Sequence, residues 1–558
     1  MYKNRGSIHI QAHVPGRNKT GNINTSSIFS TTSDTSHQIP MTNTNPALPV
    51  DQQHPHTAPL SLDEAMRLAG QLVMVRISVT NMDENLAQFL REHHIRAVCL
   101  FRNNMTDEAQ LKKLTSDLRA VLGPEALIAL DQEGGAVVRP TWVPQPPSAM
   151  ALGASDDADL CYQVGAAVAR GIKALGFNWN FAPVLDLNNN VDNPVIAERS
   201  FGADPQRAST LALAWMDGSL SEGVACCVKH FPGHGDTNVD SHRALPTVNK
   251  SLAELQAMEF APFQIAVSRN APAMMTAHIV YPALDADNPA TMSPTILTDL
   301  LREQWQYRGV VITDGMDMQA IAGRYGVGNA AVKALLAGAD MVMAIGSREA
   351  QTETLAALTE VILSGQISYQ AIQRKLQRIR QLTEAYPCID TDYQTDAADR
   401  LLMAHAWQRG LTRVGDPQPP AKGSRVRLVI RADAVSDGVS ESGIRADKVA
   451  TMLAGLYDVE TLTFSDAAHF DWHSLPQDDR FVILASTVRI RYGEAARKSW
   501  QPDLHLVLWN PFHMLDIQAP ALITYGFAPP AIEAVHAWLA GEVSAQGRIP
   551  MDITGQRH

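Results

Sequence analysis

Short apolar runs alternate with longer amphipathic segments between residues 60 and 386. This alternation is typical of successive βα units around a parallel sheet. The apolar runs predict eight strands, at 72–77, 97–101, 127–130, 177–184, 224–229, 273–277, 310–313 and 341–345. The segments between them predict helices, which include 108–122, 157–175, 205–222, 253–268 and 330–337. Eight such units predict a (β/α)8 TIM-type barrel with enlarged loops, and a doubly wound open sheet is the alternative.

Several of these strand candidates end in an ionisable residue. The residues are Asp131, Asp186, His230, His278 and Asp314. One polar residue at a strand end is usually a turn residue or a helix cap. In a barrel, however, the carboxyl ends of all strands meet at one rim, where active sites lie. Five ionisable residues in this position therefore favour the barrel and predict a functional site at its rim.

A second, smaller domain is predicted after the barrel, which we expect to span 58–386. The composition becomes polar after Tyr386 and Pro387, so 387–423 is predicted to be a linker. Apolar runs at 426–430, 481–485, 504–508 and 521–524, with helices near 444–456 and 531–539, predict a three-layer α/β/α sandwich over 424–558. This region contains no Gly-x-Gly-x-x-Gly element, so no nucleotide is assigned to it, and we expect it to pack against the barrel.

The first 57 residues differ in composition from the rest of the chain. They are rich in Ser, Thr and Asn and lack the apolar run that a signal peptide needs, which predicts a disordered, low-complexity tail at 1–57. Translation starting at Met41 is one hypothesis for this tail. No later segment approaches 18 uninterrupted apolar residues, so no transmembrane helix is expected. These features favour a cytoplasmic location.

Charge and cysteine content limit the binding partners and the cellular compartment that we expect. The net charge of −12 repels phosphate backbones and anionic lipid head groups, so neither nucleic acid nor a membrane is an expected partner. The five cysteines are Cys99, Cys161, Cys226, Cys227 and Cys388. Their odd number and the lack of Cys-x-x-Cys spacing indicate neither a disulfide framework nor a cysteine-ligated zinc site, and a reducing compartment is expected.

The densest group of chemically active residues follows the strand candidate at 224–229. This group lies in the segment 229–242 and consists of Lys229, His230, His234, Asp236, Asp240 and His242. Gly233 and Gly235 permit unusual backbone angles, so we expect a mobile, non-helical loop. Asp240 and His242 are two residues apart, which places both side chains on one side of an extended segment. They are predicted to form a hydrogen-bonded dyad, in which the carboxylate orients an imidazole that exchanges protons.

Two other interpretations of this loop remain open. His230, His234, Asp236 and His242 include ligand types that suit zinc or manganese, although their spacing matches no helical ligand motif. The same residues also suit a structural loop, with polar side chains bonded to the backbone.

Two further strand ends carry carboxylates. Asp314 ends the run 309–313, and a fixed carboxylate at a barrel mouth is able to attack the anomeric carbon of a sugar and form an ester that water later hydrolyses. Asp317, three residues on, is more simply an exposed or capping acid. Asp131 opens the segment Asp131-Gln132-Glu133-Gly134-Gly135, in which a carboxylate and close backbone approach suit hydrogen bonding to sugar hydroxyls.

The residues of the barrel region resemble glycoside hydrolase family 3, specifically its β-N-acetylglucosaminidase branch. The signature of that branch is a Lys-His-Phe-Pro-Gly-His-Gly loop ending in Asp-Ser-His, which here runs from Lys229 to His242. The similarity extends through 131–135, 178–186, 188–194, 198–202, 275–278 and 312–314. The segment 525–550 also resembles the C-terminal α/β domain of longer members.

The resemblance implies a retaining exo-hydrolase that removes non-reducing terminal β-linked N-acetylglucosamine, typically from muropeptides during peptidoglycan turnover. Asp314 would be its nucleophile, His242 its general acid and then base, and Asp240 the residue that tunes His242. Five residues match positions that bind sugar hydroxyls in the family: Asp131, Arg139, Arg199, Lys229 and His230. Neither a cofactor nor a metal is implied.

Three alternatives remain open on the same residues. A glucosidase or xylosidase differs only in the sugar it accepts, and a phosphorylase differs in using phosphate instead of water on the same ester. The non-enzymatic alternative is an inactive sugar-binding barrel.

Overall fold

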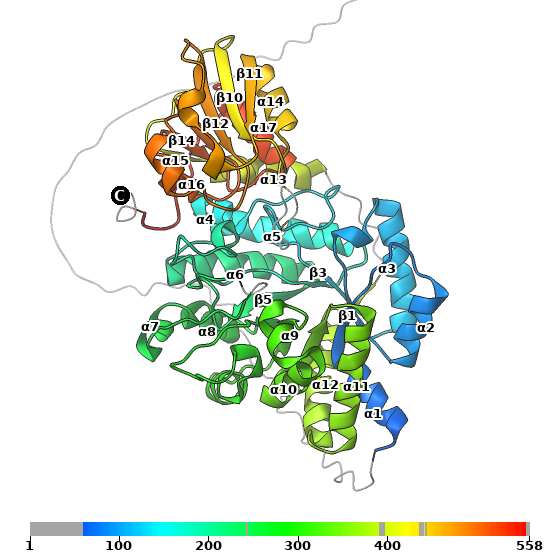
Figure 1. The fold of residues 1–558 in the computed structure, drawn as a ribbon. Helices are drawn as coiled ribbons and strands as arrows, with labels where there is room; N and C mark the ends of the chain where they lie inside the picture. Colours follow the sequence, from blue (N-terminus) through cyan, green and yellow to red (C-terminus); the bar gives the residue numbers. More distant parts are fainter. Residues whose placement is uncertain (1–59, 241–243, 390–396, 435–439, 441–442, 554–558) are drawn as a thin grey trace, which may run out of the picture. The chain divides into compact units, whose positions relative to one another are not determined.

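The computed structural model describes residues 60–240, 244–389, 397–434, 440 and 443–553, and it contains the predicted barrel (Figure 1). Eight parallel strands pair in sequence order, and β1 closes the sheet by pairing with β8. They are β1 (Val73–Arg76), β2 (Ala97–Cys99), β3 (Leu127–Leu130), β4 (Trp179–Asn180), β5 (Ala225–Phe231), β6 (Ala273–Thr276), β7 (Val310–Gly315) and β8 (Met341–Ala344). The expected (β/α)8 barrel is thus confirmed, and the open sheet is excluded.

Helices surround the barrel because its strands are buried on both faces and each amphipathic segment covers part of the outer face. Asp107, Asp157 and Asp204 cap the first turns of three of them. The helices of this part are α1 (Leu62–Gln71), α2 (Glu84–Glu92), α3 (Glu108–Leu122), α4 (Ala149–Ser155), α5 (Ala158–Lys173), α6 (Pro205–Ser221), α7 (Leu252–Ala257), α8 (Phe260–Ser268), α9 (Gln319–Tyr325), α10 (Val327–Ala337), α11 (Arg348–Leu363) and α12 (Tyr369–Ala385), with a π-helix at Thr295–Gln304.

Two elements of the barrel differ from the prediction. The strand predicted at 177–184 is reduced to the two residues of β4, since Pro183 has no N–H to give to a sheet. The single helix predicted at 253–268 is divided into α7 and α8 at Met258 and Glu259. Pro262 explains the division, because its ring would clash with the carbonyl group of residue 258 in a continuous helix.

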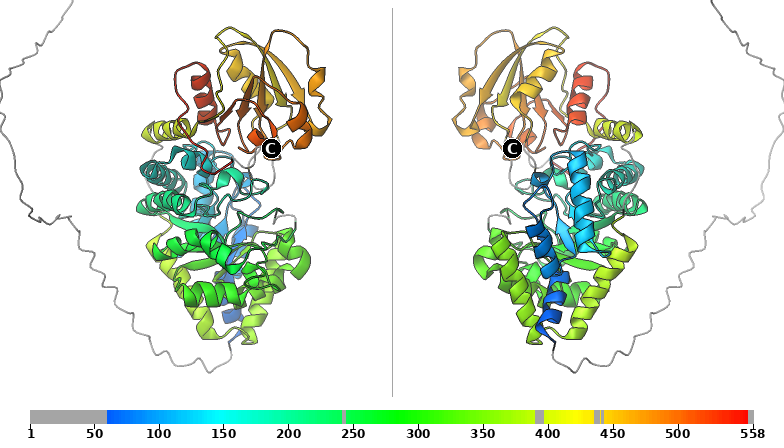
Figure 2. Two further views of the ribbon diagram at one scale, coloured as in Figure 1. Left: turned by 90° about the vertical axis from the view of Figure 1, so that its left-hand side faces the viewer. Right: turned by 90° about the vertical axis from the view of Figure 1, so that its right-hand side faces the viewer.

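The second sheet has six strands in the order β11-β10-β12-β13-β14-β9. Helices α14 (Ala446–Ala454) and α17 (Pro529–Leu539) cover one face, and α15 (Glu494–Ser499) covers the other (Figure 2). The predicted α/β/α sandwich is therefore confirmed. Its strands are β9 (Thr412–Val414), β10 (Arg425–Arg431), β11 (Asp458–Phe464), β12 (Phe481–Ser486), β13 (Leu504–Val507) and β14 (Ala521–Ile523), with the short helix α16 (His513–Asp516) after β13.

The segment 387–423, predicted as a linker, contains regular structure. Helix α13 (Ala397–Gly410) carries the buried residues Met403 and Trp407, and β9 pairs antiparallel with β14. Strand β11 was also not predicted. It lies at the sheet edge, where all of its residues except Phe464 are exposed or only partly buried, so it lacks the apolar run that identified the other strands.

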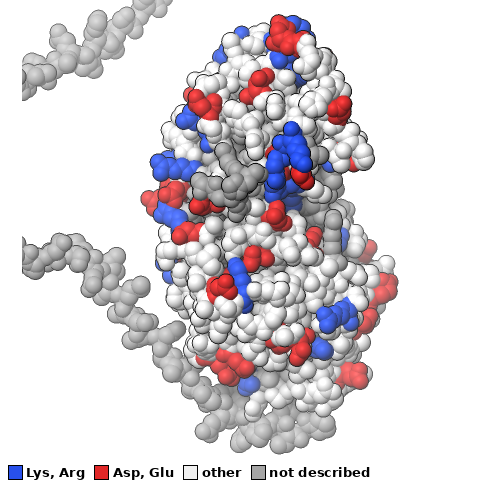
Figure 3. Space-filling model, turned by 60° about the vertical axis from the view of Figure 1, so that its left-hand side comes forward, with Lys and Arg blue, Asp and Glu red and all other residues white. Residues whose placement is uncertain are grey.

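The described residues contain no helix with the length and hydrophobicity needed to cross a membrane. On the face drawn in Figure 3, acidic and basic side chains are interspersed. The predicted tail at 1–57 and the alternative start at Met41 lie outside the described residues.

Candidate active site

A cavity with a volume of about 340 Å³ lies at the carboxyl ends of the barrel strands. All eight strands contribute to its lining, either with a strand residue or with one that follows within two positions. In strand order these residues are Arg76, Phe101, Asp131, Phe181, Lys229, Met275, Asp314 and Met343. The strand-end residues therefore meet at one rim, as the sequence predicted for Asp131, His230 and Asp314.

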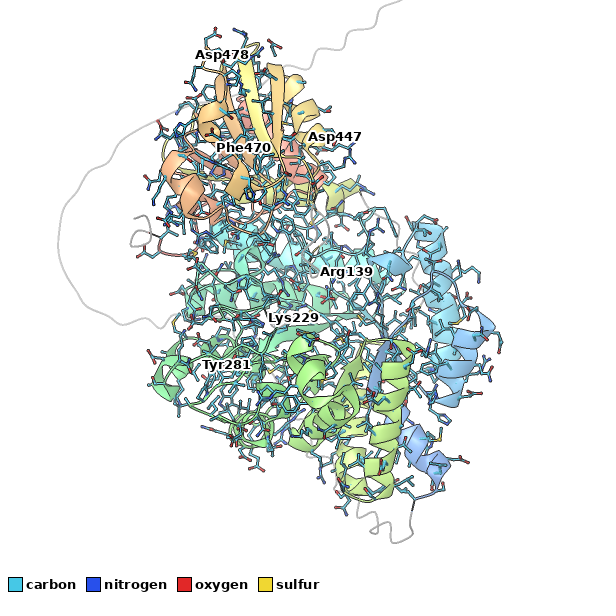
Figure 4. All side chains as sticks on the ribbon, viewed as in Figure 1. Arg139, Lys229, Tyr281, Asp447, Phe470 and Asp478 are labelled. Atoms are coloured by element: carbon cyan, nitrogen blue, oxygen red, sulfur yellow. The ribbon has the colours of Figure 1, made fainter. Side chains whose placement is uncertain are left out.

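Lys229 is the centre of an ion-pair cluster on one side of this cavity. Figure 4 labels Lys229 and Arg139 of this cluster. Its Nζ lies 2.7 Å from Asp131 Oδ1 and 2.7 Å from Glu133 Oε1. Arg139 Nη2 bonds Asp131 Oδ2 at 3.1 Å, and Arg199 forms a bidentate pair with Glu133 at 2.8 Å for each bond. The cluster brings together four of the five predicted sugar-binding residues, and it adds Glu133, which the prediction did not include as a site residue.

Charge pairing keeps these groups ionised although they are buried. Burial alone would raise the pKa of Asp131, but Lys229 and Arg139 outweigh it and hold that pKa below its ordinary value. The pKa of Glu133 is also held well below its ordinary value, because Arg199 and Lys229 outweigh burial. Burial would lower the pKa of Lys229, whereas Asp131 and Glu133 raise it. The site therefore offers fixed, charged donors and acceptors for hydroxyl groups.

Asp186 holds the start of the loop after β5. Its carboxylate accepts hydrogen bonds from the backbone N–H of His230 at 3.1 Å and of His234 at 2.6 Å, and it lies 2.7 Å from His230 Nδ1. Asp186 does not line the cavity, whereas His230 and His234 do. Its role is thus to orient the two histidines. Burial, followed by the charge of His230, lowers the pKa of His234 to about 4, so that ring is neutral at neutral pH.

Asp314 lies at the end of β7, and its Oδ1 accepts a 2.7 Å hydrogen bond from the N–H of Gly315. His278 anchors this strand end from β6, since its Nε2 lies 2.9 Å from the carbonyl oxygen of Gly315. The Nδ1 of His278 bonds the hydroxyl of Thr291 at 2.8 Å. Because the Gly315 carbonyl oxygen can only accept a hydrogen bond, Nε2–H is the donor, which defines the tautomer. His278 is 1% exposed and does not line the cavity, so it acts through the strand end that carries Asp314.

The glycines of the β5 loop allow close packing against neighbouring segments. Gly233 has φ +134°, and a Cβ on Gly235 would lie 1.6 Å from the carbonyl oxygen of Leu187. Asn193 also holds this loop, donating from Nδ2 to the carbonyl oxygens of His234 and Gly235 at 2.8 and 2.9 Å. The loop is non-helical, as predicted, but residues 231–235 are all buried. Residues 231–235 are packed against neighbouring segments in the structure, and the expected mobility of the loop stays a prediction.

The predicted dyad lies farther along this loop. Asp240 is half-buried and accepts a 3.0 Å backbone hydrogen bond from Ala244. It is not among the residues that line the cavity. His242 lies outside the described residues. The dyad between Asp240 and His242 therefore stays a prediction.

Several lining residues were not predicted as site residues. Asp317, expected to be an exposed or capping acid, is exposed and also lines the cavity. Arg76 is the last residue of β1, but the strand was predicted to run to Ile77, so the strand-end criterion did not identify it. As for the metal alternative, no three His, Cys, Asp or Glu residues converge on a metal position within the described ranges. His230 and His234 instead bond Asp186 and Thr237.

The model of the glycosyl hydrolase family 3 N-terminal domain matches residues 65–382, which hold the barrel and this cavity. The chain belongs to glycosyl hydrolase family 3. The family predicted from the motif is thereby confirmed, and with it the assignment to the glycoside hydrolases.

The relatives of this chain match different shares of its length. The structure of a family 3 β-N-acetylglucosaminidase from Paenibacillus sp. str. FPU-7 aligns with a TM-score of 0.80 at 32% identity, over 89% of this chain and 99% of that one. A β-hexosaminidase of Neisseria meningitidis serogroup C is 38% identical over 280 residues, which are 49% of this chain and 77% of that protein. The β-hexosaminidase A of Pseudoalteromonas piscicida is 33% identical over 340 residues, or 57% of its length.

Proposed function

We propose that this family 3 chain is a retaining exo-glycosidase that releases a terminal, non-reducing, β-linked N-acetylglucosamine residue. The observation that carries the proposal is the arrangement of the cavity. The Asp314 carboxylate on β7 lines it together with the Lys229 cluster around Asp131, and β3 and β7 are opposite strands of an eight-stranded barrel. A carboxylate facing a group of hydrogen-bonding charges suits one pyranose with C1 at Asp314 and its far end at Asp131. The similarity to the Paenibacillus β-N-acetylglucosaminidase supports N-acetylglucosamine as the sugar.

In the first step, the Asp314 carboxylate attacks C1 and the glycosidic bond breaks. His242 gives its proton to the departing oxygen, so the products are the aglycone alcohol and a covalent glycosyl ester on Asp314. In the second step, His242 removes a proton from water as that water attacks C1, which releases the sugar and restores the Asp314 carboxylate. The Asp240 carboxylate stabilises the imidazolium form of His242.

The Lys229 cluster binds the sugar in this proposal. Asp131 accepts hydrogen bonds from sugar hydroxyls, and Lys229, Arg139 and Arg199 donate to their oxygens. His230 contributes a ring nitrogen, since its other nitrogen is engaged by Asp186. The pairs within the cluster fix these groups before substrate arrives, which reduces the ordering that binding requires.

The same proposal extends to the natural substrate and its setting. The natural substrates in this proposal are muropeptides, so the aglycone is the rest of the muropeptide. The process is peptidoglycan turnover, and the location is the cytoplasm. A purified muropeptide that carries a terminal N-acetylglucosamine is the direct probe. Release of free N-acetylglucosamine from it, measured by mass spectrometry, is the expected result.

Two measurements test the chemistry. The first compares 4-nitrophenyl N-acetyl-β-glucosaminide with the β-glucoside and β-xyloside, each with and without inorganic phosphate. Preference for the N-acetylglucosaminide and release of free sugar are expected, whereas a sugar 1-phosphate product would identify a phosphorylase. The second measurement traps the enzyme with a slowly hydrolysed fluorosugar and locates the label by peptide mass spectrometry. A label on Asp317 or on another carboxylate would contradict the assignment of Asp314, and Asp314→Asn is the unlabelled control.

A further inference from the structure

Arg76 is a cation that lines the cavity and has no ionic partner among the residues that the structure describes. It is the last residue of β1, and its backbone carbonyl accepts a 2.8 Å hydrogen bond from Nε2 of the buried Gln351. Arg139, Arg199 and Lys229, the other cations of the lining, are each paired with Asp131 or Glu133. The Nε of Arg76 is buried without a hydrogen-bond partner. A buried donor without a partner is costly, so this arginine suggests a group supplied by a ligand.

The orientation of the Arg76 guanidinium is defined by an aromatic ring. Its Cζ lies 5.1 Å from the centre of the Phe101 ring, and the Cζ of Arg139 lies 5.6 Å from the same centre. Stacking on an aromatic face orders a guanidinium while it leaves the in-plane N–H groups available. The fixed fork of an arginine matches two oxygens of one carboxylate, sulfate or phosphate group.

The charges around the cavity are separated. Four cations on the lining contributed by β1 to β5 face only two carboxylates there, Asp131 and Glu133, and the cations are Arg76, Arg139, Arg199 and Lys229. Asp314 lies in β7 and Asp317 follows that strand. The side away from the proposed nucleophile is therefore positive by two charges. A substrate that carries a negative charge on that side would be attracted to it, and a neutral sugar would leave the charge of Arg76 uncompensated.

The position of Arg76 indicates which part of the sugar would meet it. In the proposed function, the sugar extends from Asp314 on β7 to Asp131 after β3, so its two sides face β5 and β1. We place Lys229 and His230 on β5 against the edge of the ring that carries the C2 acetamido group and the C3 hydroxyl. The edge that faces β1 then holds the ring oxygen and C5, whose substituent is the C6 hydroxymethyl group. Phe101 offers an apolar surface beside it for the C6 methylene group.

The geometry points to Arg76 as a specificity residue that binds an anionic group on C6 of the sugar, so that acidic N-acetylglucosaminides are preferred substrates. This inference rests on the proposed function, because it uses the same orientation of the sugar. A carboxylate, a sulfate and a phosphate share the required chemistry, and the experiment separates them.

The test compares kcat/KM for 4-nitrophenyl N-acetyl-β-glucosaminide with kcat/KM for its 6-phosphate, its 6-sulfate and the corresponding 6-carboxylate. We expect at least one acidic substrate to exceed the neutral one about tenfold or more in the wild type, and Arg76→Gln to abolish that ratio. Arg76→Lys, which keeps the charge without the fork, should retain part of it. Arg102→Gln is the matched control, since Arg102 also stacks on a ring, that of Trp142, but does not line the cavity.

Two results would overturn the inference. The first is a wild type that prefers the neutral substrate to all three acidic ones. The second is an equal loss on neutral and acidic substrates in Arg76→Gln, which would make Arg76 a ligand of a neutral hydroxyl. If the wild type cleaves none of the glycosides, the proposed function fails instead. Calorimetric binding of N-acetylglucosamine 6-phosphate to wild type and Arg76→Gln then decides the inference, since no difference in affinity would reject it.

Discussion

Arg489 of the second domain donates from Nη2 to Oε1 of Glu198 at 2.6 Å, in a buried ion pair whose side chains are 5% and 1% exposed. Its Nη1 donates to the carbonyl oxygen of Val195 at 2.7 Å, and Val195 lines the cavity. Trp509 of the same domain also donates to Glu198, at 2.8 Å. The residue after Glu198 is Arg199, which pairs with Glu133 in the Lys229 cluster. The second domain therefore holds the loop that supplies one side of the site.

Replacing Arg489 by methionine should lower both stability and activity. The variant leaves the Glu198 carboxylate buried without its cation, which costs about 3 to 5 kcal/mol of unfolding free energy. We also expect KM for a chromogenic N-acetylglucosaminide to rise severalfold, because Val195 and Arg199 lose their support. Chemical denaturation and steady-state kinetics measure the two effects.

Arg445→Met is the control for this experiment. Arg445 pairs with Asp447 in the same domain, but both side chains are largely exposed, so little change is expected. If Arg489→Met lowers stability while KM and kcat stay at their wild-type values, the second domain stabilises the barrel without positioning the site.

Replacing His278 by alanine should lower kcat about tenfold or more and leave KM nearly unchanged. His278 touches the Gly315 carbonyl and not the cavity, so its loss should misplace the Asp314 carboxylate without removing a sugar contact. Glutamine offers an N–H in a similar position, so His278→Gln should restore part of kcat. A rise in KM at constant kcat would show that His278 acts on binding instead.

The sequence predicts the rim of this site well because its signal is local. An apolar run followed at once by an ionisable residue defines a strand and its carboxyl end, and this identified Asp131, His230 and Asp314. The relationships that sequence did not reveal join distant residues. Asp186 and His230 are 44 positions apart, and Arg489 and Glu198 are 291 apart. Two further features were not predicted, the packing contact of Gly235 with Leu187 and the edge strand β11. Each depends on a neighbouring segment that the local sequence pattern does not specify.

Stability should fall as the pH is lowered from 6.5 to 4, because burial lowers the pKa of three buried histidines, His234, His505 and His513. Burial lowers the pKa of His513 and of His234 to about 4, whereas an unfolded histidine titrates at about 6.5. Between these values the unfolded chain binds a proton that the folded chain does not, so acidification favours unfolding. Each histidine adds a slope of up to about 1.4 kcal/mol per pH unit.

Denaturation midpoints between pH 4.5 and 7 measure this slope. His513→Gln should reduce the slope of stability against pH by the contribution of one proton. It should not alter the kinetics, since His513 lies in the second domain and bonds the Val488 carbonyl. An unchanged slope would mean that His513 is protonated in the folded state.

Buried carboxylates affect stability at lower pH than the histidines do. The pKa values of Asp131 and Asp186 lie below their ordinary values, so the stability these groups contribute is present above about pH 4 and is lost on further acidification.

His242→Ala should slow the release of poor leaving groups far more than that of good ones. An alkyl or sugar aglycone leaves as a strong base and needs a proton in the transition state, so we expect a loss of about 100-fold or more. A dinitrophenyl aglycone leaves as a weak base, and the loss of rate with this aglycone should be much smaller.

Asp240→Asn should show the same pattern to a lesser degree, since the imidazole of His242 remains but its protonated form loses a counter-charge. Asp314→Asn, which removes the proposed nucleophile, should abolish turnover of both substrates. Equal losses on both substrates in His242→Ala would exclude His242 as the acid, because a residue that gives no proton cannot distinguish aglycones by their basicity.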